Sequence, residues 1–91
     1  MAQVLVTMRI MPEGVETDLH KLENDVKAEI KRFGGDVAKV EVLPVAFGLK
    51  SVNITFISDE AHGGTEELEK KISAVHGVSG VEVTDVRRAI G

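Results

Sequence analysis

The sequence contains no cysteine, no tryptophan and no tyrosine, and it has two prolines and three phenylalanines in 91 residues. Without cysteine the chain can form no disulfide, and it has no thiolate for metal binding or nucleophilic catalysis. No apolar run approaches the roughly 18 residues of a membrane-spanning helix, and the N-terminus lacks the basic start of a signal peptide. We therefore expect a cytoplasmic protein without membrane contact.

The chain also lacks excess positive charge, since 15 acidic and 11 basic residues give a net charge of −4. Broad nucleic-acid binding through phosphate contacts requires the opposite balance. With 91 residues, the chain is long enough for one modest hydrophobic core. We expect a single domain over residues 1–91.

Alternating apolar residues predict four strands, and apolar residues at three- and four-residue spacing predict two helices. The expected strands cover residues 4–11, 38–42, 51–56 and 81–84. The first helix is expected from Thr17 or Asp18 to the glycine pair at 34–35, and the second from about Thr65 to Gly77. In the second strand, Ala38, Val40 and Val42 are expected on the buried face.

The order strand, helix, strand, strand, helix, strand predicts an α+β fold, the ferredoxin-like βαββαβ sandwich, with both helices on one face of a four-stranded antiparallel sheet. Strands two and four carry mid-strand charges, namely Lys39, Glu41 and Glu82, which is typical of exposed edges. Right-handed crossovers then place the loop between strands two and three at one end of the sheet and the C-terminal strand end at the other.

No catalytic or metal-binding pattern emerges from the residues. The three histidines, His20, His62 and His76, fall on different elements, so a shared metal is not expected. The turn at 62–65 lacks the lysine and spacing of a phosphate-binding loop. We find no nucleophile beside a base, and we expect neither a cofactor nor a metal.

Two binding functions on this fold compete with a partner-binding role. RNA recognition needs aromatic residues on the open face of strands one and three, but that face reads Leu5, Thr7, Arg9 and Ser51, Asn53, Thr55. A regulatory module would associate through its edge strands and carry a small-ligand cleft. Neither function has a motif in this sequence.

The most unusual stretch is the apolar loop at residues 43–50, Leu-Pro-Val-Ala-Phe-Gly-Leu-Lys. Loops are usually polar because their backbone faces water. Phe47 is therefore expected either to pack under the end of the sheet or to anchor a partner. The sequence leaves both interpretations open.

Several motifs together resemble archaeal members of the translation elongation factor 1-beta family, over essentially the whole chain. The specific parts are the loop Pro-Val-Ala-Phe-Gly-Leu-Lys at 44–50 and the tail Thr-Asp-Val-Arg-Arg at 84–88. Supporting parts are Ile-Met-Pro at 10–12, Thr-Asp-Leu at 17–19 and Gly-Gly-Thr-Glu-Glu-Leu-Glu at 63–69.

The resemblance implies a guanine nucleotide exchange factor, not an enzyme, that promotes exchange of GDP for GTP on elongation factor 1-alpha. It implies that a basic residue near the C-terminus enters the Mg²⁺ region of this GTPase, with Arg88 nearest that position and Arg87 beside it, while the other end of the domain holds the GTPase. Where eukaryotic members end in a lysine-containing tail, this chain has two arginines. The free protein is expected to be a monomer. The implied partner-binding residues are Pro44, Ala46, Phe47, Gly48, Lys50, Asp85, Arg87 and Arg88.

Overall fold

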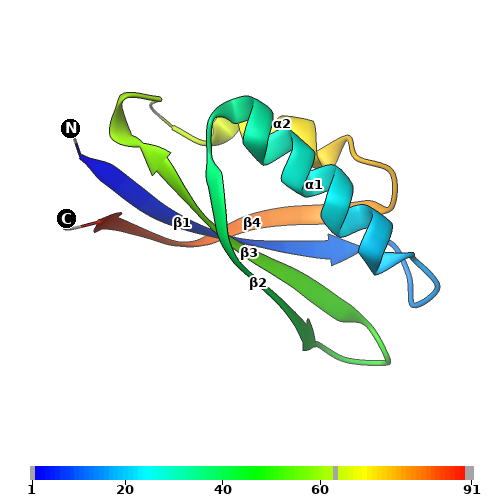
Figure 1. The fold of residues 1–91 in the computed structure, drawn as a ribbon. Helices are drawn as coiled ribbons and strands as arrows, with labels where there is room; N and C mark the ends of the chain where they lie inside the picture. Colours follow the sequence, from blue (N-terminus) through cyan, green and yellow to red (C-terminus); the bar gives the residue numbers. More distant parts are fainter. Residues whose placement is uncertain (1, 63, 90–91) are drawn as a thin grey trace.

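The chain forms a four-stranded antiparallel sheet with both helices on one face (Figure 1). The computed structural model describes residues 2–62 and 64–89, without the side chains of His62 and Ala89. Gly63 of the expected turn and residues 90–91 of the tail lie outside the described residues. The elements are β1 (Gln3–Pro12), α1 (Leu19–Phe33), β2 (Asp36–Pro44), β3 (Lys50–Asp59), a short 3₁₀ turn (Glu60–His62), α2 (Glu66–Ser73) and β4 (Val78–Ala89).

The strand order β2-β3-β1-β4 confirms the predicted ferredoxin-like topology. The two central strands carry the cleanest apolar alternation, because each pairs on both sides and buries one face under the helices. The charged strands β2 and β4 form the edges, as predicted.

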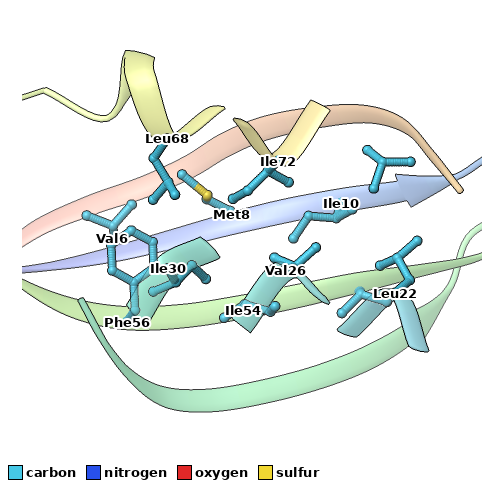
Figure 2. Packing of buried hydrophobic residues seen from close by; sticks show 12 residues of the cluster. Val6, Met8, Ile10, Leu22, Val26, Ile30, Ile54, Phe56, Leu68 and Ile72 are labelled. Carbon is cyan, nitrogen blue, oxygen red and sulfur yellow. The ribbon is translucent and has the colours of Figure 1, made fainter. Parts of the chain in front are cut away.

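The hydrophobic core lies between the sheet and the helices (Figure 2). Each fully buried apolar side chain contributes roughly 1.5–3 kcal/mol to folding. Phe56 is the largest fully buried side chain, and its ring meets that of Phe33 edge-on at a centroid distance of 6.4 Å. The buried apolar residues are Val6, Met8 and Ile10 of β1, Val52, Ile54 and Phe56 of β3, Leu22, Val26 and Ile30 of α1, Leu68 and Ile72 of α2, and Val78.

Asp18, rather than Thr17, caps α1. Its carboxylate accepts hydrogen bonds from the backbone N–H groups of His20 and Lys21, both at 3.1 Å. Thr17 instead accepts one from the N–H of Gly14 and so orders the preceding turn. Gly34 ends the helix with φ +104°, in the left-handed region that favours glycine.

The prediction that Ala38 shares a buried face with Val40 and Val42 is wrong for Ala38, and Val42, although it lies opposite Val52, is 44% exposed. A register shift between Val37 and Lys39 makes Ala38 the extra residue of a β-bulge, and Ala38 is exposed. Val37 takes its place opposite Phe56 and is partly buried against the core. The bulge therefore changes which residue of β2 faces the core, while β2 stays paired with β3 on both sides of it.

The last strand is much longer than the predicted 81–84, because β1 offers a hydrogen-bonding edge along its whole length. β4 pairs with β1 from Val78 opposite Pro12 to Ala89 opposite Gln3, with register shifts between Thr7 and Met8 and between Met11 and Pro12. The two tail arginines therefore lie within the strand and not after it.

The molecule is elongated, with extents of 42 × 21 × 18 Å. The β2–β3 hairpin lies at one end and the end of β4 at the other, as predicted, and the start of β1 and the turn before α2 lie beside the end of β4 (Figure 1). We call these the hairpin end and the tail end. Among the described residues, no helix is long and apolar enough to cross a membrane.

Candidate functional site

The structure divides the predicted partner-binding residues between the two ends of the sheet. Pro44 ends β2 and pairs with Lys50 at the start of β3, so the five residues of the loop motif gather at the hairpin end. Asp85, Arg87 and Arg88 lie on the C-terminal half of β4, towards the tail end. The sequence placed each group correctly but gave no orientation to its side chains.

A tight turn presents Phe47 at the tip of the hairpin. The N–H of Leu49 donates to the carbonyl of Ala46 at 2.9 Å, and the N–H of Val45 donates to the carbonyl of Leu49 at 2.9 Å. Both central residues have positive φ, +53° for Phe47 and +80° for Gly48, as in a type I′ turn. Glycine adopts this region easily, whereas a bulky side chain is strained there.

Phe47 is 97% exposed, so the interpretation that it packs under the sheet is wrong. An exposed phenylalanine on strained backbone gains nothing from the core that would offset the strain. Such strain persists where the surrounding structure over-determines it, and it clusters at functional sites. The ring of Phe47 is therefore accessible to solvent at the tip of the hairpin.

Other exposed apolar side chains surround this turn, and one of them was missed in the sequence. Val15, in the loop after β1, is 62% exposed. A Cβ built on Gly48 would lie 3.4 Å from Val15 Cγ1, so Val15 lies against the turn. A single valine in a loop gives no sequence signal, because only the fold brings it to the hairpin. We call these residues the hairpin patch: Val15, Val42, Leu43, Val45 and Phe47.

At the tail end, Arg87 and Arg88 point to opposite faces of the sheet. Directly opposite residues of an antiparallel pair share a face. Arg88 lies opposite Val4, on the face that carries the helices, and Arg87 lies opposite Leu5, on the open face. The two arginines therefore reach different surroundings.

Each tail arginine has its own carboxylate. Arg87 Nε lies 2.8 Å from Asp85 Oδ2 on the open face. Arg88 Nη2 donates to both carboxylate oxygens of Glu60, at 2.8 and 2.9 Å. The hydrogen bond with Glu60, and then the attraction between the charges, raises the pKa of the Arg88 guanidinium. Sequence reasoning missed Glu60, which is 28 residues from Arg88.

A hollow of about 300 Å³ lies beside this ion pair. Its walls come from β1, β3 and β4 near the tail end and from the residues just before α2. Val4, Val6 and Val86 make it largely apolar, and Glu60 and Thr65 stand at its polar side. Val86 is 58% exposed, so this end of the helix-bearing face is incompletely covered.

The open face of the sheet carries polar residues at its centre, an apolar pair, Leu5 and Ile57, nearer the tail end, and no aromatic residue on its central strands. Thr7 and Thr55 face each other with hydroxyl oxygens 3.0 Å apart, and Arg9 lies opposite Asn53. Phe56, the aromatic residue of β3, is in the core. In the part of the chain that the structure describes, no three His, Cys, Asp or Glu residues are grouped to hold a metal ion.

Comparison with known proteins identifies a family over nearly the whole chain. Residues 5–89 match the EF-1 guanine nucleotide exchange domain. The chain is 40% identical over 88 residues to elongation factor 1-beta of Methanothermobacter thermautotrophicus, covering 97% of this chain and 98% of that protein. It is 45% identical over 89 residues to elongation factor 1-beta of Desulfurococcus amylolyticus, with the same coverage.

Solved structures confirm the fold, at low sequence identity. The ACT domain from the GTP pyrophosphokinase of Chlorobium tepidum superposes with a TM-score of 0.60 at 21% identity, covering 89% of this chain and 97% of that domain. The C-terminal domain of MgtC from Mycobacterium tuberculosis gives a TM-score of 0.63 at 12% identity, covering 97% of this chain and 88% of that one.

The fold is thus shared with unrelated modules, and the function follows from the sequence relationship. The chain belongs to the EF-1 guanine nucleotide exchange domain family of elongation factor 1-beta, and it is a guanine nucleotide exchange factor that promotes exchange of GDP for GTP on elongation factor 1-alpha, not an enzyme.

Proposed function

We propose that this exchange factor uses its two ends for different tasks: the hairpin end holds the GTPase, and the tail end opens the nucleotide site. The observation that carries the proposal is the 97% exposed Phe47 on positive-φ backbone, together with the other exposed apolar residues of the hairpin patch. Well-packed aromatic anchors dominate the binding energy of many interfaces. Pro44, Ala46, Gly48 and Lys50 shape the turn that presents the ring.

The tail end is suited to electrostatic work at a phosphate and Mg²⁺ site. Mg²⁺ is held by oxygen ligands and bridges nucleotide phosphates, so a guanidinium that replaces it weakens the hold on GDP. Arg88 is the residue we assign to this role, with Asp85 and Arg87 contacting the GTPase beside it. Exchange is accelerated because the factor binds the nucleotide-free GTPase more tightly than the GDP-bound form.

Other features of the free protein belong to the same proposal. Residues 1–91 form one exchange domain, which is a monomer when free and acts in the cytoplasm, where its partner works. It needs no cofactor. It contacts neither nucleic acid nor membrane, in keeping with the net charge of −4 and the lack of aromatic residues on the open face of the two central strands.

The substitution Phe47→Asn tests the anchor directly. Asn-Gly is a preferred sequence for a type I′ turn, because asparagine tolerates positive φ. The free energy of unfolding should therefore stay the same or rise, by up to about 1 kcal/mol. Binding to elongation factor 1-alpha should weaken by at least about 2 kcal/mol, as expected for loss of an aromatic anchor.

Chemical denaturation measures the first effect and a titration with nucleotide-free GTPase the second. Lys39→Asn is the matched control, since Lys39 is exposed on the same hairpin but outside the hairpin patch; its affinity should stay close to that of the wild type. Unchanged affinity of Phe47→Asn would remove Phe47 from the interface.

A further inference from the structure

The Glu60 carboxylate is built into the turn that follows β3. Its backbone N–H donates to the carbonyl of Ala2 at 3.0 Å, which ties the turn to the start of β1. The preceding Asp59 accepts a hydrogen bond from the N–H of Ala61 at 2.8 Å and holds the turn from within. Glu60 therefore has a defined position relative to the strand that pairs with Arg88.

Glu60 contacts Arg88 in a way that leaves most of the guanidinium available. Both hydrogen bonds, at 2.8 and 2.9 Å, come from Nη2. Nε and Nη1 make no hydrogen bond with the residues that the structure describes. Because a guanidinium carries five N–H donors, a second anionic group can bind the remaining nitrogens without displacing Glu60.

The pair is exposed, with 68% of the Arg88 side chain and 48% of the Glu60 side chain accessible. Exposed ion pairs contribute little to folding, so the main effect of Glu60 is on where Arg88 points. A free arginine side chain samples many rotamers, and ordering it during binding reduces the useful interaction. Arg87 is not held by another element of the fold, since the carboxylate that it contacts, Asp85, lies on its own strand.

We infer that Glu60 is a positioning residue for nucleotide exchange, which holds the Arg88 guanidinium at the tail end, beside the apolar hollow, with its outer nitrogens directed at an anionic group of the GTPase. This inference rests on the proposed role of Arg88. It adds that the tail is pre-ordered by the turn before α2, so that elongation factor 1-alpha meets an arginine already in place.

The test is labelled-GDP release from elongation factor 1-alpha at increasing concentrations of wild type, Glu60→Gln, Arg88→Ala and the double variant. Glu60→Gln should lower the maximal stimulated rate by about three- to tenfold, the range for one long side chain that must be ordered on binding. The half-saturating concentration should not change, because the hairpin end sets affinity. In the Arg88→Ala background, Glu60→Gln should have no further effect.

Glu82→Gln is the matched control, because Glu82 lies on β4, like Arg88, and forms an exposed ion pair at 3.5 Å with Arg9 of β1. It should exchange like the wild type, and all variants should keep the wild-type melting temperature. An equal loss from Glu60→Gln in both backgrounds would show that Glu60 acts through the turn, which overturns the inference. A faster rate in Glu60→Gln would also overturn it, since Glu60 would then be restraining Arg88.

The outcomes separate the inference from the proposal beneath it. If Arg88→Ala slows release and Glu60→Gln does not, the positioning role is wrong and the role of Arg88 stands. If the wild type accelerates release and Arg88→Ala does so equally well, the assignment of Arg88 is wrong, and the role of Glu60 is overturned with it.

Discussion

For single residues of this chain, the sequence predicted unusual positions but not the conformation or contacts of their side chains. The composition of the loop at 43–50 predicted that Phe47 was unusual, but it could not decide between a core residue and an anchor. That choice depends on the turn geometry, in which positive φ at 47 and 48 directs the ring into solvent. Val15 was not identified at all, because its importance comes from its contact with Gly48.

Gly35 is a residue whose size, rather than backbone freedom, is required. A Cβ at this position would lie 2.7 Å from Phe56 Cδ2 and 3.0 Å from Ile30 Cγ2, both in the core. Gly35→Ala should therefore lower the free energy of unfolding by about 1–3 kcal/mol, the usual result of overpacking. Thermal or chemical denaturation measures the loss.

Gly80→Ala is the control for this prediction, because no atom lies within 4 Å of a Cβ built there. Its stability should stay within about 0.5 kcal/mol of the wild type. Equal stability of the two alanine variants would mean that the contact of Gly35 with Phe56 relaxes without cost.

At the level of elements, apolar periodicity predicted every strand and helix, while the bulges could not be predicted. A bulge adds one residue and so shifts the alternation of inward and outward side chains, and no residue pattern in β2 or β4 indicates its position. The register shift between Thr7 and Met8 leaves Thr84 without a partner on β1, and it has a larger consequence than the bulge in β2. Strict alternation from Val83 would put Arg87 on the face of the helices, whereas the observed register puts Arg88 there.

The β4 register predicts that the two tail arginines differ in exchange. Arg88→Ala should slow stimulated GDP release by at least about 10-fold, equivalent to about 1.4 kcal/mol of barrier. Arg87→Ala should cause a smaller loss, because Arg87 lies on the open face with its Nε bound to Asp85. Stopped-flow release of labelled GDP measures both rates.

Magnesium gives an independent check on the arginines. If Arg88 acts at the cation site, excess Mg²⁺ should oppose the wild type more strongly than Arg88→Ala, since cation and guanidinium compete. Equal rate losses in both single variants, with the same response to Mg²⁺, would contradict a distinct role for Arg88.

The whole molecule was the most predictable level, because topology follows from the order of the elements. The chain order alone placed the apolar loop and the arginine tail at opposite ends, and the strand pairings confirm this. The sequence thus predicted at which ends of the sheet the proposed site residues lie. The contact between Glu60 and Arg88 could not be predicted, because it depends on side-chain positions across three strands.

The separation of the two ends predicts that they contribute independently to exchange. The molecule is 42 Å long and a rigid sheet connects the ends, so Phe47 and Arg88 share no contact. Phe47→Ala should raise the half-saturating concentration of the factor and leave the maximal rate close to that of the wild type. Arg88→Ala should lower the maximal rate and leave the half-saturating concentration unchanged, because its loss falls on the barrier and not on binding.

In the double variant the two losses, as free energies from the apparent second-order rate constants, should add to within about 0.5 kcal/mol. A concentration series of labelled-GDP release with the four proteins gives all of these values. A larger interaction energy between the substitutions would show that binding through the hairpin end and nucleotide release at the tail end are coupled through the GTPase.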